Sequence, residues 1–307
     1  MGMIPVIRQL AVLLLLIAVG FVANKCHVMG KEEERTISKI IINISCPAMI
    51  INSVTTSGRL DSTSFLLVIF AVAIVYYLAM PFAAKGIIRL FRMPSAHRDE
   101  LESMFVYSNL GFMGIPVIGA ILGQESILYI SIFIAIFNIS IFSYGLLLLG
   151  GGKSGAALSR MINPGTVSAL AAVALYLLNV QLPSLLLQPI ASLGSTTTPL
   201  AMVVIGSSLA GQSIGEMLKD KSLYLFSAIR LLLLPALCLF VCRWFLGGSL
   251  LLGTMVLLTA MPVASNVVML RSEMGGEGDY VARGVAFSTL LSVLTIPVIS
   301  ALLEIFG

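Results

Sequence analysis

The sequence predicts an all-α integral membrane protein with ten transmembrane helices, arranged as two inverted five-helix repeats with crossed broken helices. Three observations support this fold. Hydrophobic residues make up 58% of the chain and charged residues only 10%, with a mean hydropathy of +1.05, whereas a soluble domain carries about 25% charged residues. Apolar runs alternate with short connections that carry positive charge. Prolines interrupt these runs at similar places in the two halves of the chain.

The apolar runs define the predicted spans. The 307 residues accommodate roughly ten spans of about 20 residues each, and little remains for a soluble domain. In chain order, the predicted spans are Ile4–Ala23, Ile37–Thr55, Ser64–Phe82, Leu101–Leu122, Ile127–Leu149, Pro164–Val180, Leu187–Ala210, Leu223–Leu246, Leu250–Leu270 and Val281–Leu303.

Positive charge orients these spans. Most of the 18 Lys and Arg residues follow the first, third, fifth, seventh and ninth spans. Because Lys and Arg are retained on the cytoplasmic side, we expect a multi-pass protein of the cell (plasma) membrane with both termini extracytoplasmic. The residues that carry this asymmetry are Lys25, Lys31, Arg35, Lys39, Lys85, Arg89, Arg92, Arg98, Lys153, Arg160, Lys219, Lys221, Arg271 and Arg283.

The fourth span is expected to be broken. The stretch 108–123 is apolar, yet it contains several glycines, Asn109 and Pro116. A proline removes a backbone N–H and clashes with the carbonyl four residues earlier, which predicts that the helix stops near Ile115 and restarts at Val117. Such a break at membrane depth requires surrounding protein or a water-filled cavity, and interrupted helices are where secondary transporters tend to hold substrate.

The prolines also indicate an internal repeat. Spans two to four contain Pro47, Pro81 and Pro116, and spans seven to nine contain Pro199, Pro235 and Pro262. Since each half has an odd number of spans, the second half enters the bilayer from the opposite side. The predicted organisation is a first repeat at 1–150, a cytoplasmic linker at 151–163 and a second, inverted repeat at 164–307.

We expect the two broken spans to cross near the bilayer centre, where their helix N-termini favour an anion. An amide such as that of Asn109 can donate to a carboxylate while staying neutral. The alternative is that the polar residues only cap the broken ends or bond neighbouring helices. The candidate substrate-binding residues at the crossing are Asn109, Gly111, Pro116, Val117, Pro262, Ser265 and Asn266.

Three further residues are candidates for substrate contact. Asn43 and Thr198 lie close to Pro47 and Pro199 in spans two and seven, where bonding to a carbonyl freed by the proline is the competing interpretation. Arg230 is the basic residue well inside a span. A charge at that depth is costly, so we expect either a carboxylate partner and a role in the substrate site or gate, or snorkelling to the interface.

Other chemistry finds no support in the sequence. Asp and Glu occur only at the ends of the predicted spans, and the four cysteines have no metal-site spacing. Catalytic, phosphate-binding and metal motifs are missing as well. We therefore predict neither an enzyme nor a nucleic-acid-binding protein, no metal, and no cofactor apart from a coupling Na⁺ or H⁺, between which the sequence does not decide.

Three segments resemble a known family. The motif 109–116, Asn-Leu-Gly-Phe-Met-Gly-Ile-Pro, and the segments 260–266 and 288–297 resemble signatures of the auxin efflux carrier family, which includes bacterial malate and malonate permeases. The resemblance covers the whole chain. It implies a fold related to bile acid/sodium symporters and transport of small organic anions, with Asn109, Pro116, Pro262 and Asn266 at the crossing.

The chain departs from the plant members of this family in two places. It has a short connection after Leu149 where they have a long loop, and Tyr76 and Tyr77 where they have an Asp–Lys pair. We therefore expect a prokaryotic type of carrier, acting on a small organic anion such as a mono- or dicarboxylate by alternating access. The alternatives are a sodium-coupled symporter of a larger amphipathic anion and an anion sensor that does not transport. A homodimer is one option for the oligomeric state.

Overall fold

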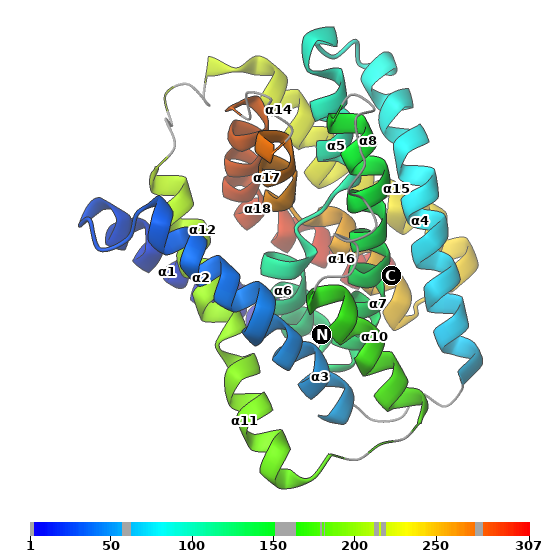
Figure 1. Cartoon of the computed structure of the whole chain (residues 1–307). Helices are drawn as coiled ribbons and strands as arrows, with labels where there is room; N and C mark the ends of the chain where they lie inside the picture. Colours follow the sequence, from blue (N-terminus) through cyan, green and yellow to red (C-terminus); the bar gives the residue numbers. More distant parts are fainter. Residues whose placement is uncertain are drawn as a thin grey trace.

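The computed structural model describes residues 3–56, 63–150, 164–178, 180, 182–211, 215, 219–273 and 279–307, and in these ranges the regular structure is helical apart from one isolated β-bridge. The predicted linker 151–163 lies outside the described residues. In chain order the helices (Figure 1) are α1 (Met3–Lys25), α2 (Lys31–Ile40), η1 (Ile41–Ser45), α3 (Cys46–Thr56), α4 (Thr63–Leu90), η2 (Ser95–His97), α5 (Arg98–Val106), η3 (Leu110–Gly114), α6 (Ile115–Leu122), α7 (Glu125–Ser140), η4 (Ile141–Gly145), α8 (Leu146–Leu149), α10 (Pro164–Leu177), α11 (Ser184–Ser195), α12 (Thr197–Ala210), α14 (Lys221–Ala228), η5 (Ile229–Leu233), α15 (Leu234–Leu246), α16 (Leu250–Ala260), α17 (Ser265–Glu273) and α18 (Asp279–Phe306).

Helix occupies every predicted span. Five continuous helical stretches in the described part of the chain are long and apolar enough to cross a membrane. They are 66–90, 125–149, 184–210, 221–246 and 279–306. The all-helical membrane class therefore agrees with the sequence, while the count of ten spans and their inverted repeat stay predictions.

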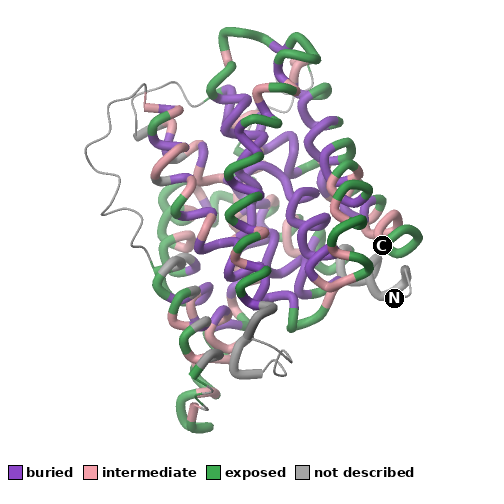
Figure 2. The backbone as a smooth tube through the Cα atoms, turned by 90° about the vertical axis from the view of Figure 1, so that its right-hand side faces the viewer, coloured by how far each residue is buried: buried purple, intermediate pink, exposed green. Residues whose placement is uncertain are grey.

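Burial follows the pattern of a protein in lipid. Figure 2 shows that buried residues concentrate in the centre of the helix assembly and exposed residues on its outside. The exposed side chains on the outer helices are themselves large and apolar, as with Phe82 on α4 and Trp244 on α15, which is 89% exposed. Large exposed apolar surfaces indicate an interaction with membrane or protein, and here they cover several outer helices.

The helices pack in two groups that each draw on both halves of the sequence. In the first helix group α1 packs on α12, and α3 packs on α10 and α11. The second helix group contains α4 to α8 and α14 to α18, with α15 and α18 both packed on α16 (Figure 1). The groups meet where α10 and α3 contact α7 and where α12 contacts η3.

A close helix contact joins α1 to α12 inside the first helix group. A Cβ atom on Gly206 would lie 1.9 Å from the carbonyl oxygen of Ile17, and one on Gly20 would lie 2.0 Å from the carbonyl oxygen of Val203. Small residues let membrane helices approach to backbone contact. These two glycines therefore set the distance between the first and seventh predicted spans.

Three of the prolines follow π-helical turns, which the sequence did not predict. Pro47, Pro116 and Pro235 each lie two residues after a π-helical turn, namely η1, η3 and η5. In each case the carbonyl that the proline ring would strike, four residues back, lies within that wider turn. The π turn accommodates the ring, and the helix continues. The expected stop at Ile115 and restart at Val117 are thus wrong, because 110–122 is continuous helix.

Candidate functional site at the helix crossing

The fourth and ninth predicted spans are interrupted, and the two interruptions contact each other. Helix α5 ends at Val106 and η3 begins at Leu110, while α16 ends at Ala260 and α17 begins at Ser265. The extended segments between them form an antiparallel β-bridge that joins Ser108 to Val263. This contact lies within the second helix group.

Two backbone hydrogen bonds hold the bridge. The N–H of Asn109 donates to the carbonyl of Pro262 over 2.8 Å, and the N–H of Ala264 donates to the carbonyl of Tyr107 over 3.0 Å. The N–H of Val263 donates to the hydroxyl of Ser288 on α18. Backbone groups freed by the interruptions are thus satisfied by each other, as burial requires.

The break in the fourth span therefore lies at 107–109 and not at Pro116. Pro116 and Val117 are buried in the first turn of α6, so they do not expose helix N-terminal amides. The ninth span is interrupted at 261–264, which includes Pro262, as expected. The break predicted at Pro116 is misplaced, because the second helix of the fourth span starts after its N-cap residue Asn109.

Arg230 lies at the crossing and is completely buried. The π turn η5 before Pro235 carries it, and its exposed fraction is 0%. Its Nη1 donates to the carbonyl of Thr259 over 2.6 Å, and its Nη2 donates to the hydroxyl of Ser108. The guanidinium therefore bonds both interrupted spans, the fourth at Ser108 and the ninth at the carbonyl end of α16, and because it is fully buried it does not snorkel to an interface.

The charge of Arg230 has no partner of opposite sign in the part of the chain that the structure describes. Among the described residues no carboxylate lies within ion-pair distance of it, and its Nε has no hydrogen-bond partner. The carbonyl end of α16 offers only the partial negative charge of a helix C-terminus. A buried charge without a counter-ion costs several kcal/mol, so this site favours an anion.

Two buried tyrosines lie near the interrupted segment 107–109. Tyr76 and Tyr77 on α4 are 7% and 4% exposed. The ring of Phe137 contacts both Tyr77, at a centroid distance of 6.1 Å, and Tyr107, at 5.6 Å. The Tyr77 hydroxyl is buried without a hydrogen-bond partner, and an unsatisfied buried polar group typically costs about 1–3 kcal/mol.

The predicted candidates on the two helix starts lie beside this site. Asn109 is 3% exposed, and its side-chain oxygen accepts the N–H of Phe112, which caps the new helix. A Cβ atom on Gly111 would meet nothing within 4 Å. Ser265 and Asn266 are half-buried in the first turn of α17. The capping role predicted as the alternative for Asn109 is present, and its amide NH₂ group is a further donor.

Of the two candidates in spans two and seven, Asn43 bonds within its own span. Asn43 is exposed, and its amide donates to the carbonyl of Lys39 in the same helix. Thr198 is half-buried on α12. The polar contact between these spans instead joins the hydroxyls of Ser45 and Thr196, 2.9 Å apart.

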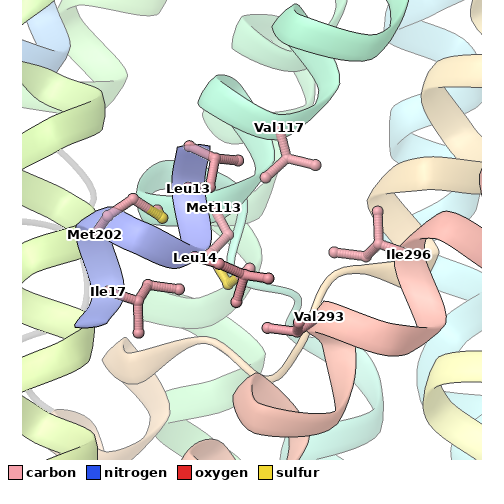
Figure 3. Close-up of a pocket in the computed structure, with 8 residues that line it drawn as sticks. All are labelled: Leu13, Leu14, Ile17, Met113, Val117, Met202, Val293 and Ile296. Atoms are coloured by element: carbon pink, nitrogen blue, oxygen red, sulfur yellow. The ribbon is translucent and has the colours of Figure 1, made fainter. Parts of the chain in front are cut away.

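An apolar pocket lies next to the crossing, at the boundary between the two helix groups (Figure 3). Met113 and Val117, on the helix that Asn109 begins, contribute to its wall. The remaining lining residues are Leu13, Leu14, Ile17, Met202, Val293 and Ile296. The residues that line this pocket carry no polar side-chain group.

The sequence did not indicate Ser108 and Thr259, which accept hydrogen bonds from Arg230. It also did not indicate two buried carboxylates near one end of the second helix group. Glu102 is 1% exposed and pairs with Lys85 at 3.5 Å. Glu100 is 6% exposed; it bonds the Nε of Arg271 over 3.0 Å and contacts His97. The acidic first turn of α5 is the signal that could have found them.

Comparison with known proteins identifies the family of the chain. A family model described as "Membrane transport protein" matches residues 5–159 and 153–300. An uncharacterized transporter of Methanothermobacter thermautotrophicus is 25% identical over 294 residues, which is 94% of this chain and 96% of the relative. An uncharacterized transporter of Methanocaldococcus jannaschii is 23% identical over 216 residues, or 66% of this chain and 68% of the relative. The names of the family and of both relatives indicate a membrane transporter. The chain belongs to the auxin efflux carrier-type family of membrane transport proteins.

Proposed function

We propose that this protein carries a small organic anion, a mono- or dicarboxylate, across the plasma membrane by alternating access. The observation that carries the proposal is Arg230, a fully buried guanidinium at a helix crossing without a carboxylate partner among the described residues. A bound carboxylate supplies the missing counter-ion, and charge-assisted hydrogen bonds to guanidinium are among the strongest that proteins make.

Neutral donors complete the proposed site. The side-chain amide of Asn109 and the backbone N–H of Gly111 lie on one side of the crossing, and Ser265 and Asn266 begin the helix on the other. Helix starts attract anions because their N–H groups lack intrahelical partners. The open space over Gly111 gives a ligand access to the backbone.

Alternating access requires two parts that move against each other. The crossing belongs entirely to the second helix group, and the first helix group contacts it through α12 and η3. We propose that displacement between the groups opens the site to one side of the membrane at a time. The ten-span inverted arrangement, with both termini extracytoplasmic, is part of this proposal, and a homodimer is compatible with it.

The contact of Arg230 also bears on ion coupling. Carbonyls at the end of an interrupted helix, such as those of 259–261, can hold a coupling cation, but the Thr259 carbonyl accepts a bond from Arg230. A fixed cation therefore fills that helix end. Since a membrane potential, negative inside, expels an anion by about 2.3 kcal/mol per charge per 100 mV, we propose export that needs no coupling ion.

Counterflow in proteoliposomes tests this function. Uptake of labelled malate or lactate into vesicles preloaded with the same anion should require the protein and should be equal in sodium and potassium media. Sodium dependence would favour a coupled symporter of the bile-acid type, and absence of counterflow despite anion binding would favour a sensor.

Substitution of Arg230 tests the site itself. Arg230→Gln should reduce counterflow at least about tenfold, as expected for loss of a bond to a charged group, while the protein stays folded because a buried charge is removed. The matched control is Arg243→Gln, since Arg243 lies on α15 in the same predicted span but is exposed. Wild-type kinetics in the Arg230 variant would remove this residue from the site.

A further inference from the structure

We infer that Glu100 and Arg271 are positioning residues of the proposed site. They hold α5 and α17 at a fixed separation and so keep the bridge between the interrupted segments in the geometry that Arg230 requires. The inference rests on the proposed function for the role of that site. It follows from a buried ion pair that joins the same two helices as the bridge does, but at their far ends.

Helices α5 and α17 form two sides of a closed frame. Helix α5 runs toward the bridge, where the carbonyl of Tyr107 accepts the N–H of Ala264, and α17 runs away from it. Glu100 precedes Tyr107 and Arg271 follows Ala264 by the same number of residues, which is about 10 Å along each helix. The Nε of Arg271 donates to Oε1 of Glu100 over 3.0 Å. The bridge therefore joins the two helices at one end, and the ion pair joins them at the other.

Both side chains of the pair are held by further contacts. Glu100 is 6% exposed, and its Oε2 lies 2.7 Å from Nδ1 of His97. The His97 ring stacks on the ring of Tyr280 on α18, at a centroid distance of 3.9 Å. The Nη1 of Arg271 donates to the carbonyl of Leu149, at the end of α8, over 3.2 Å. Side chains locked by packing and by second hydrogen bonds can maintain a geometry, which a mobile surface pair cannot.

The pair acts on the site through the bridge. The helices that it joins, α5, α8 and α17, lie at one end of the second helix group (Figure 1). Ser108 follows α5 directly, and the segment 261–264 precedes α17. A change in the separation of the two helices would therefore displace Ser108 relative to Arg230, to which it is hydrogen bonded. Hydrogen bonds weaken steeply when their geometry is lost, so the guanidinium would lose its fixed orientation toward a ligand.

The second buried carboxylate on α5 provides a matched control. Glu102 is 1% exposed and pairs with Lys85 on α4 at 3.5 Å, so this pair joins α5 to a helix outside the bridge. Loss of the basic partner leaves each glutamate with one further polar contact. Arg271→Gln and Lys85→Gln therefore remove equivalent partners, but only Arg271→Gln releases α5 from α17.

Cross-linking measures the bridge without any transport. In a chain without its natural cysteines that carries Ser108→Cys and Val263→Cys, Arg271→Gln should slow disulfide formation severalfold, because the two thiols must meet in a narrow range of geometries. Lys85→Gln should leave the rate unchanged. Both variants should lower the apparent melting temperature, since each leaves a buried carboxylate without its basic partner.

Counterflow kinetics measure the site itself. Arg271→Gln should raise the KM for malate or lactate severalfold with a smaller change in maximal rate, because the donors to the anion are displaced. Lys85→Gln should keep the wild-type KM. Arg271→Lys serves if the glutamine variant does not fold. Its ammonium keeps a charge for Glu100 but lacks the guanidinium fork, so it should show the same changes to a smaller extent.

The outcomes separate this inference from the proposed function. Equal effects of Arg271→Gln and Lys85→Gln on cross-linking and on KM would overturn the inference, because the pair would then contribute only stability. An unchanged cross-linking rate or a wild-type KM in Arg271→Gln would overturn it as well. Absence of counterflow by the folded wild-type protein would instead count against the proposed function, and the cross-linking comparison would still show whether the pair holds the bridge.

Discussion

At the scale of single residues, the burial of Arg230 depends on its two acceptors. Of these two acceptors, only the Ser108 hydroxyl can be removed by substituting a side chain, because the other is the backbone carbonyl of Thr259. Ser108→Ala should lower the stability of the protein by about 1–3 kcal/mol, because a buried donor of a charged group loses its partner. Thermal unfolding of the purified protein in detergent measures this as a lower apparent melting temperature.

The control for this prediction is another buried serine. Ser227 on α14 is 1% exposed, and its hydroxyl has no partner, so Ser227→Ala should leave stability unchanged or raise it. Equal losses in the two variants would mean that the Ser108 hydroxyl does not support Arg230.

Residue types alone indicated two residues of the candidate site. An arginine inside an apolar span and an asparagine before a helix start are both unusual, and they led to Arg230 and Asn109. The acceptors Ser108 and Thr259 could not be predicted. One acts through a hydroxyl common in membrane helices and the other through its backbone carbonyl. Which hydroxyl and which carbonyl face Arg230 depends on how helices that are distant in the sequence pack against each other.

At the scale of elements, the bridge between the interrupted helices makes a cross-linking prediction. Ser108 and Val263 are opposite each other, and the flanking residues make the hydrogen bonds. In such a pair the Cα atoms lie about 4.5 Å apart, within the range for a disulfide. Ser108→Cys with Val263→Cys, in a chain without its natural cysteines, should oxidise readily, as shown by mass spectrometry of linked peptides. A pair that stays reduced would contradict the crossing.

The glycine contact of α1 with α12 makes a second prediction at this scale. Gly206→Ala should destabilise the protein by at least about 1–3 kcal/mol, the usual cost of overpacking, because the new methyl group meets a backbone carbonyl that cannot turn away. Gly86→Ala is the matched control, since a Cβ there meets nothing within 4 Å. It should be neutral or slightly stabilising. Melting temperatures of both variants give the comparison.

The elements also show where sequence patterns stop being informative. Apolar runs predicted each helix because length and hydropathy are local properties. The effect of the prolines was not local: Pro116 lies within a continuous helix after a π turn, while the break occurs at 107–109. The proline removes the same N–H in either geometry. Packing against neighbouring segments determines whether the helix widens or stops.

At the scale of the whole molecule, the charge carried through the membrane is the decisive quantity. If the substrate is a monoanion moved without a coupling ion, net efflux transfers one charge per cycle. A potential of 100 mV then changes the driving force by about 2.3 kcal/mol. Exchange of one substrate molecule for another transfers no net charge. We therefore predict that net efflux of lactate from proteoliposomes depends on an imposed potassium-diffusion potential, whereas lactate counterflow does not. Cotransport with one proton or sodium ion would make net efflux electroneutral, so efflux insensitive to potential would show that the fixed charge of Arg230 does not replace a coupling cation.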